Sequence, residues 1–299
     1  MPFKIAIASG KGGTGKTTVA VNLYRHLIRY YSSDIQLVDC DVEEPNDSIF
    51  FQEATIVDKQ VVYQEIPEIE LSKCTFCQKC AEYCEFNAIV VLPSTRFAEV
   101  NKSLCHSCGA CFEACQNQAI FPRKQSIGSI NRYENIPGKG LKEGVLEIGS
   151  VMQTIMIREL KKSVSSNNEI IIYDAPPGTS CPVVETVADA DFVILVTEPT
   201  PFGLYDLQLS VDLLNDMNKS FGVIINKAGL GDERVYDFLK QKGITLLGEI
   251  PFSREYAVNY AKGELFKKVP KIIEHNFRSI TEKMEKGFLQ YERNSDFKR

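Results

Sequence analysis

The sequence predicts an α/β protein with a doubly wound, mostly parallel sheet that carries a small inserted α+β domain. Short apolar runs alternate with amphipathic helical patterns along most of the 299 residues, which is typical of doubly wound sheets. A cysteine-rich segment with an internal repeat interrupts this alternation and indicates a separate module. A chain of this length can bury one large core together with a small satellite domain.

Six nearly continuous apolar runs predict buried parallel strands. They are Phe3–Ala8, Ile35–Val38, Ile170–Tyr173, Phe192–Thr197, Phe221–Ile225 and Leu246–Ile250. Helical stripes lie between them, at Val19–Leu27, Val151–Leu160, Leu207–Leu214 and Ile273–Met284. We expect the last stripe to pack on the core rather than to anchor a membrane, and the charged tail after about Tyr291 to fray.

The insert is expected at residues 63–123. The flanking segments, 1–62 and 124–299, would then form one discontinuous domain. The polar segment Ser126–Gly140 contains glycine and proline, so we expect it to be a hinge between the insert and the main domain.

Composition and charge exclude several classes of function. The formal net charge of −5 has mixed signs, so no nucleic-acid partner is expected. Neither an export signal nor an apolar run long enough to cross a bilayer is present, which predicts a cytoplasmic protein without stable membrane insertion. Eight of the ten cysteines lie between Cys74 and Cys115. In a reducing compartment such clustering indicates metal binding rather than disulfides.

A glycine-rich loop between the first strand and the first helix predicts a phosphate site. Its sequence satisfies G-x-x-x-x-G-K-[ST] in the context that such a loop requires. Backbone N–H groups would surround phosphate oxygens, Lys16 would reach the β- and γ-phosphates, and Thr17 would ligate Mg²⁺. The predicted nucleotide-binding residues of the loop are Gly10, Lys11, Gly12, Gly13, Thr14, Gly15, Lys16, Thr17 and Thr18.

Three aspartates follow predicted strands. Asp39 and Asp41 come after the second strand and Asp174 ends the third. Ligands bind at the carboxyl edge of parallel sheets, so one carboxylate could hold Mg²⁺ and another could orient the attacking water. The predicted Mg²⁺ site comprises Thr17, Asp39, Asp41 and Asp174. For any one aspartate taken alone, a helix cap or turn is the alternative.

Ordered motifs resemble those of the MinD/ParA/Mrp family of P-loop ATPases. The resemblance implies binding of ATP and ADP, ATP hydrolysis, and a homodimer or related heterodimer in the ATP-bound state. The matching segments are Ser9–Thr18 for the deviant Walker A motif, Asp39–Asp41 for switch I, Asp174–Gly178 for switch II, Ile225–Lys227 for the adenine-binding strand end and Gly248–Phe252 for a segment lining the base.

The resemblance also implies individual roles. Lys11 would cross an ATP-sandwich dimer to the partner's phosphates and act like an arginine finger. Asp41 would position the hydrolytic water, so the implied catalytic residues are Lys11, Lys16 and Asp41. Asp39 would support Mg²⁺ and Asp174 would hold its outer shell. The implied adenine site consists of Asn226, Lys227, Pro251 and Phe252. A solvated Lys11 and an Asn226 that only forms a turn are the alternatives.

The insert contains two runs of C-x₂-C-x₂-C-x₃-C, displaced by 31 positions. This spacing is the bacterial two-cluster ferredoxin pattern, in which the fourth cysteine of each run ligates the other cluster. We therefore expect two [4Fe–4S] clusters. The first would be bound by Cys74, Cys77, Cys80 and Cys115, and the second by Cys105, Cys108, Cys111 and Cys84.

The segment Ile69–Pro122 resembles that ferredoxin family throughout, with one departure. Glu85 and Gln116 replace the proline that usually follows the fourth cysteine. Zinc is the competing interpretation, although four-cysteine zinc sites usually pair two C-x₂-C units.

Three further residues near these motifs have simpler expected roles. His106 is expected to be a surface residue rather than a ligand, and Cys40 a small buried side chain. Cys181 follows switch II, where some Mrp-type ATPases carry a C-x-x-C pair that binds a bridging cluster. Val184 replaces the second cysteine here, so a bridging site at Cys181 is only a hypothesis.

Three classes of function follow. In the first, the ATPase assists metallocofactor or iron–sulfur cluster assembly or delivery to a metalloprotein partner. In the second, ATP gates electron transfer through the ferredoxin-like lobe to a redox partner. In the third, the protein is a spatial positioning ATPase like MinD and ParA. Because the insert follows Asp41 and the turn at Pro45 and Asn46, we expect ATP to move or dock the lobe.

Overall fold

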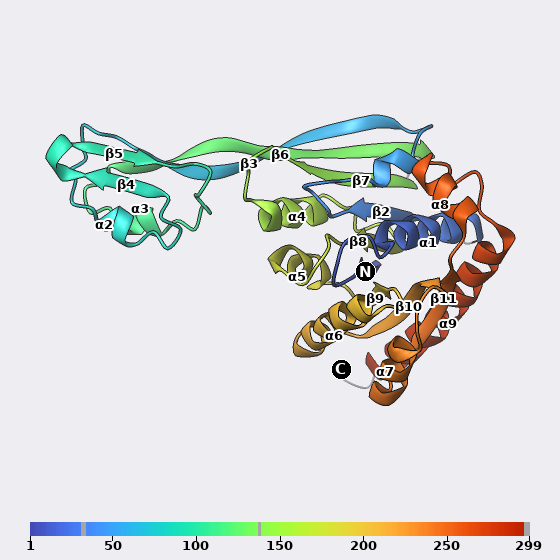
Figure 1. The fold of residues 1–299 in the computed structure, drawn as a ribbon. Helices are drawn as coiled ribbons and strands as arrows, with labels where there is room; N and C mark the ends of the chain where they lie inside the picture. The colour runs from blue at the N-terminus through green and yellow to red at the C-terminus, as the bar shows by residue number, and fades with distance from the viewer. Residues whose placement is uncertain (31–33, 137–138, 296–299) are drawn as a thin grey trace.

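A nine-stranded sheet forms the centre of the molecule, and a cysteine-rich lobe projects from it on a long ribbon (Figure 1). The structure, a computed structural model, describes residues 1–30, 34–136 and 139–295. The strand order is β11-β10-β9-β1-β8-β2-β7-β6-β3. Strand β1 lies between β8 and β9, so the chain winds outward in both directions from the centre.

All six predicted strands are present and pair in parallel. The prediction of a large, mostly parallel sheet is therefore confirmed. Because parallel strands end at one edge, residues far apart in sequence meet there. The bounds are β1 (Phe3–Ala8), β2 (Ile35–Asp39), β8 (Ile170–Asp174), β9 (Phe192–Thr197), β10 (Phe221–Ala228) and β11 (Leu246–Pro251).

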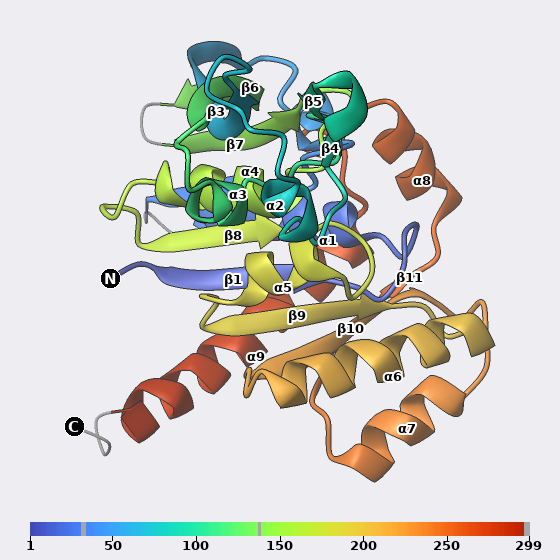
Figure 2. The same cartoon turned by 90° about the vertical axis from the view of Figure 1, so that its left-hand side faces the viewer.

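Helices cover both faces of the sheet (Figure 2). The four predicted stripes lie on α1, α4, α6 and α9, whereas the three short helices α5, α7 and α8 were not predicted. One face carries α1 (Lys16–Tyr30), α8 (Arg254–Ala261) and α9 (Lys271–Ser295). The other carries α4 (Gln153–Lys162), α5 (Cys181–Val187), α6 (Pro201–Asp216) and α7 (Arg234–Lys242).

The C-terminal stripe packs on the sheet, as predicted. Ile273, Phe277, Ile280 and Met284 of α9 are at most 2% exposed and belong to the core on that face. Among the described residues, no helix combines the length and apolar character needed to cross a membrane. Helix α9 continues through Ser295, beyond the residue where fraying was expected to begin, and residues 296–299 lie outside the described chain.

Three strands extend the sheet at one side. β7 (Lys139–Leu146) pairs in parallel with β2, and β6 (Ile120–Ile136) pairs antiparallel with both β7 and β3 (Thr55–Ile69). The prediction of a hinge at Ser126–Gly140 was wrong, because its described residues belong to β6 and β7 while residues 137–138 lie outside the described chain. Ile127 and Ile130 are buried in the core of the main domain, and the register with β3 skips Ile127, so a bulge interrupts the alternation of faces between them.

Beyond the end of β7, residues 63–69 pair only with residues 120–126. This two-stranded segment, the stalk, spans about 23 Å at the usual rise per residue. Both expected insert boundaries, 63 and 123, fall in the stalk, and a shift in register between Val62 and Tyr63 lies at the first of them. The lobe at its tip contains α2 (Lys79–Glu82), β4 (Ile89–Leu92), η2 (Pro93–Thr95), β5 (Phe97–Val100) and α3 (Ala110–Ala114).

The packing of α9 gives a direct stability prediction. Replacing Phe277 by alanine should lower the free energy of unfolding by about 3–5 kcal/mol, because it leaves a cavity against the sheet. Urea denaturation of the full chain, followed by circular dichroism, measures this change. Arg278→Ala is the control because its side chain is 73% exposed, and it should cost less than about 0.5 kcal/mol. Equal effects would contradict a buried helix.

Candidate functional site

The predicted phosphate loop connects β1 to α1 at the carboxyl edge of the sheet. Gly13 and Gly15 have φ angles of +77° and +96°, which residues with a Cβ rarely adopt. At Gly15 a Cβ would also lie 2.2 Å from Nδ2 of Asn226. Glycine is therefore required at Gly15 by both conformation and space.

The end of β10 braces this loop. Nδ2 of Asn226 donates a hydrogen bond to the carbonyl of Thr14 at 2.8 Å, and Nζ of Lys227 donates to the carbonyl of Gly13 at 3.0 Å. Asn226 is only 8% exposed. Its amide nitrogen thus supports the phosphate loop, a contact that the expected adenine role did not include.

Glu198 joins two lysines of the site. Its carboxylate accepts from Nζ of Lys11 at 2.6 Å and from Nζ of Lys227 at 3.0 Å. Burial alone would raise the pKa of Glu198, but these hydrogen bonds outweigh it and hold the pKa below its ordinary value. The sequence analysis missed Glu198, although it follows β9 directly and the strand-end argument used for Asp39 applies to it equally.

A cavity of about 400 Å³ lies beside the phosphate loop. Most predicted nucleotide residues line it: Gly12, Gly13, Gly15, Lys16, Thr17, Thr18, Asn226, Lys227, Pro251 and Phe252. The predicted catalytic residue Asp41 lines it as well. Gly10, Lys11 and Thr14 do not. Further lining residues were not predicted, and they are Glu44, Asn46, Pro177, Ser253, Tyr256, Ala257 and Tyr260. Four of them follow the last predicted segment on or beside α8, which sequence reasoning did not identify.

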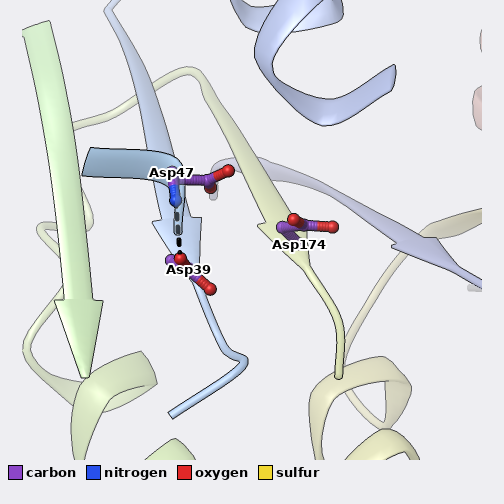
Figure 3. Close-up of side chains that lie close together, drawn as sticks. All are labelled: Asp39, Asp47 and Asp174. Carbon is purple, nitrogen blue, oxygen red and sulfur yellow. Dashed lines mark hydrogen bonds between the residues drawn. The ribbon is translucent and has the colours of Figure 1, made fainter. Parts of the chain in front are cut away.

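The expected Mg²⁺ residues divide into two groups. Thr17, Asp39 and Asp174 come together beneath the loop, where the Thr17 hydroxyl donates to Asp174 at 2.7 Å and both aspartates are at most 2% exposed. Asp41 instead lines the cavity. The Asp39 carboxylate also accepts backbone N–H bonds from Asp41 at 3.0 Å and Asn46 at 2.8 Å. It accepts a third from Asp47 at 3.0 Å (Figure 3).

Burial governs the electrostatics of these carboxylates. It raises the pKa of Asp174 to about 7, although Lys16 and the Thr17 hydroxyl oppose the shift. Burial, and then the charge of Asp174, also raise the pKa of Asp39. Oδ1 of Asp174 has no hydrogen-bond partner within the described chain. Clustered carboxylate oxygens are the donors that Mg²⁺ prefers, so the residues present fit this ion.

The eight cysteines of the lobe form two groups. Each group lines its own cavity, and the members are those expected from the sequence. One cavity is lined by Cys74, Cys77, Cys80 and Cys115, and the other by Cys84, Cys105, Cys108 and Cys111. All ten cysteines of the chain are free of disulfides.

The 31-residue repeat is also present in the backbone. Positive φ angles recur at three pairs of positions related by the repeat: Phe76 and Ser107, Gln78 and Gly109, and Asn87 and Gln118. Backbone N–H groups donate to the first and fourth sulfurs of each run at 3.2–3.4 Å, from Phe76 to Cys74, Ala88 to Cys84, Ser107 to Cys105 and Ala119 to Cys115. Such donors would stabilise thiolates.

Burial raises the pKa of three of the lobe thiols, and that of Cys111 reaches about 11. Metal binding would therefore displace protons from these sulfurs. The four-sulfur sets, the amide donors and the absence of disulfides together fit metal clusters.

Three residues outside these sets can now be placed. Cys40 is fully buried and His106 is exposed, stacking on Phe86 with ring centroids 3.9 Å apart. Both predictions are confirmed in this respect. Cys181 is exposed at the first residue of α5, and its bridging role stays a prediction.

Comparisons with known proteins agree with the nucleotide site. Residues 5–266 match the family described as CbiA, the CobQ/CobB/MinD/ParA nucleotide binding domain. An uncharacterised protein of Methanocaldococcus jannaschii is 34% identical over 268 residues, which are 88% of this chain and 91% of that protein. An iron-sulfur cluster carrier protein of Pyrococcus horikoshii is 26% identical over 267 residues, which are 83% of this chain and 74% of the carrier.

A solved structure shares the fold. The cell division ATPase MinD of Pyrococcus furiosus matches with a TM-score of 0.59 and 21% identity, over 96% of this chain and 99% of MinD. At this identity the likeness concerns the fold alone.

The paired lysines at Glu198 make stability depend on pH. Because the folded-state pKa is lowered, the ionised carboxylate stabilises the fold above the ordinary pKa of 4.5, and this contribution is lost as the pH falls through the folded-state pKa. Glu198→Gln should cost about 1 kcal/mol at neutral pH, and the cost should vanish in acid. Urea denaturation at both pH values measures it.

Glu53→Gln serves as the control. It breaks an exposed ion pair to Lys267, in which the glutamate is 77% exposed. A pH-independent cost of Glu198→Gln would show that the charge is not responsible.

Proposed function

The chain belongs to the CobQ/CobB/MinD/ParA family of nucleotide-binding domains, and we propose that it is a Mg²⁺-dependent ATPase that assists metallocofactor or iron–sulfur cluster assembly or delivery. One observation carries the proposal. The segment after the buried Asp39 leads from the phosphate site, through the stalk, to a lobe with two sets of four cysteines.

The nucleotide would bind in the cavity beside the phosphate loop. The loop glycines and Lys16 would receive the phosphates, and Thr17 with Asp39 and Asp174 would hold Mg²⁺. When bound, Mg²⁺ would offset negative charge on the phosphate oxygens. Asp41 lines the same cavity and would orient the attacking water. The base would lie toward Asn226, Lys227, Pro251 and Phe252.

Lys11 would complete the site of a second copy. In this structure its ammonium group pairs with Glu198 at 2.6 Å. To reach phosphates across a dimer, Lys11 would exchange this carboxylate for phosphate oxygens. ATP-dependent pairing, as a homodimer or with a related chain, would therefore require this ion pair to open.

The lobe would bind two [4Fe–4S] clusters. Support comes from the two sets of four cysteines, each lining one cavity, and from amide donors repeated in both halves. Relatives named iron-sulfur cluster carrier proteins share 23–26% identity with this chain. A metalloprotein acceptor would be the partner.

Nucleotide binding would reposition the lobe. The segment that Asp39 organises continues into η1 (Asp47–Phe50) and then into β3 of the stalk. Near the base of the stalk, Lys102 and Ser103 of the lobe border a cavity of about 160 Å³ with residues 147–152 of the main domain. Closure of this cavity would dock the lobe. Identical protease sensitivity with ADP and a non-hydrolysable ATP analogue would contradict the coupling.

Electron transfer to a redox partner is the second candidate function. Four sulfurs line each lobe cavity, so all cluster ligands would come from this chain. Fully ligated clusters are retained more readily than transferred, which favours redox use. Spatial positioning, the third class, has no support among the described residues beyond the shared fold.

One experiment separates delivery from electron transfer. The holoprotein, with iron-labelled clusters reduced beforehand by dithionite, is mixed with Mg-ATP and with either an apo-ferredoxin or a cluster-loaded, oxidised ferredoxin. Iron is measured in the first acceptor and the redox state in the second. Label that moves to the acceptor only with ATP supports delivery. Retained label together with ATP-dependent reduction of a cluster-loaded acceptor supports electron transfer. Neither result would contradict both functions.

Alanine substitutions of the two loop lysines should affect different steps. Lys16→Ala should abolish nucleotide binding, because its buried ammonium group faces the phosphate site. Lys11→Ala should keep nucleotide binding by the monomer but lower ATP turnover roughly 10³-fold or more, as loss of an arginine finger does. Equilibrium nucleotide binding and phosphate release distinguish the two. Normal turnover by Lys11→Ala would remove its catalytic role.

Iron content tests the lobe. Anaerobically purified protein should hold about eight irons per chain, and Cys77→Ser should lower this toward about four. Cys181→Ser is the matched control, because Cys181 is also an exposed cysteine but lies outside both sets. Zinc in place of iron, or equal losses in both variants, would contradict the cluster assignment.

A further inference from the structure

Asp47 is a fully buried carboxylate without a partner. Its exposed fraction is 0%, and neither carboxylate oxygen has a hydrogen-bond partner among the residues that the structure describes. Its backbone N–H donates to Oδ2 of Asp39 at 3.0 Å. A buried charged group left unpaired costs several kcal/mol, so this arrangement requires an explanation.

The side chain of Asp47 is directed toward two other aspartates (Figure 3). Oxygen atoms of Asp39, Asp47 and Asp174 all lie within 4.8 Å of one another. Ligand oxygens on opposite sides of a divalent cation are about 4–5 Å apart, given metal–oxygen bonds of about 2.1–2.6 Å. The three carboxylates thus have the spacing of ligands around a single ion.

The charges around Asp47 favour a cation. The charged groups that act on it most strongly are all carboxylates, those of Asp39, Asp174, Glu143 and Asp41. Lys16 acts on Asp174 and Asp41, on the side of the cluster that faces the phosphate loop. A small, hard cation with oxygen ligands would neutralise the far side and use the free oxygens of Asp47 and Asp174.

We propose that Asp39, Asp47 and Asp174 form a divalent-cation site that binds Mg²⁺ or Mn²⁺ in the absence of nucleotide. The site lies below the phosphate loop and shares Asp39 and Asp174 with the ion proposed to accompany the nucleotide, but Asp47 replaces Thr17 and the phosphate oxygens as the third ligand. It extends the proposed function but rests on the geometry of the three aspartates.

The position of Asp47 gives the ion a structural consequence. Asp47 is the first residue of η1, and Phe50 at the other end of η1 packs on Tyr260 with ring centroids 5.1 Å apart. Tyr260 lines the nucleotide cavity, and β3 of the stalk begins five residues after Phe50. A bound ion would fix η1 between the nucleotide cavity and the base of the stalk.

Titration with Mn²⁺ alone tests the site. The cluster-loaded full chain, free of nucleotide, is titrated with Mn²⁺ by calorimetry, and the loss of the free-ion EPR signal gives the stoichiometry. One Mn²⁺ per chain is expected. Asp47→Asn should weaken its binding by about 10–100-fold, the effect of disturbing a metal site. Glu43→Gln removes the same charge from an exposed position in the same segment and should leave the affinity unchanged.

Two further measurements keep the result unambiguous. Thr17→Val should retain Mn²⁺ binding without nucleotide while losing the ion that accompanies ATP. Mn²⁺ should raise the unfolding temperature of the unmodified chain but not that of Asp47→Asn, which is expected to fold because it relieves carboxylate repulsion. Equal Mn²⁺ affinity in Asp47→Asn, or absence of binding before ATP is added, would overturn the site and show that these carboxylates share protons instead. Neither outcome would affect the ATPase proposal.

Discussion

The buried carboxylate of Asp39 is the constraint on which the functional edge of this molecule depends. It lies at the end of β2, where the sheet holds it rigidly, and it accepts three backbone N–H bonds from the segment that follows. Without these hydrogen bonds, moving this segment away from the end of β2 would cost little free energy. Charge-assisted hydrogen bonds to a buried acceptor are among the stronger ones in proteins, so the conformation of residues 41–47 is tied to the state of a single side chain.

The hydrogen bonds to Asp39 bring the carboxylate of Asp47 close to those of Asp39 and Asp174, next to the proposed phosphate site. Asp39, Asp47 and Asp174 lie together beneath the phosphate loop. Glu198 forms an ion pair with Lys11, the lysine that the family resemblance assigns to phosphate binding. The aspartates and Lys11 could therefore each exchange their present neighbours for a ligand. Cations would relieve the repulsion among the buried aspartates, and the phosphates of a nucleotide would compete with Glu198 for Lys11. The first of these exchanges would act on the segment that leads to the stalk, because Asp39 binds that segment and Asp47 belongs to it.

The lobe and the main domain are stabilised by different interactions. A two-stranded ribbon is marginally stable by itself, and the lobe that it carries has only a small apolar core, centred on residues such as Phe76, Ile89 and Ile120. Order within the lobe comes from the repeated turns and from the two cysteine sets. In each set the fourth sulfur comes from the other half of the repeat, so metal bound there would cross-link the two halves. The main domain, in contrast, is held by extensive apolar layers on both sheet faces.

The sequence by itself determined the features that are encoded locally: the six parallel strands, the phosphate loop with Lys16 and Thr17, and the spacing of the lobe cysteines. Apolar runs and short motifs consist of residues that are adjacent in the sequence, so they can be recognised without a structure. Only the tertiary structure decided that the described residues of Ser126–Gly140 form strands rather than a hinge, that Glu198 pairs with Lys11, and that Asp47 lies beside Asp39 and Asp174. Each of these outcomes depends on contacts between residues far apart in the sequence. A local sequence pattern cannot predict such contacts.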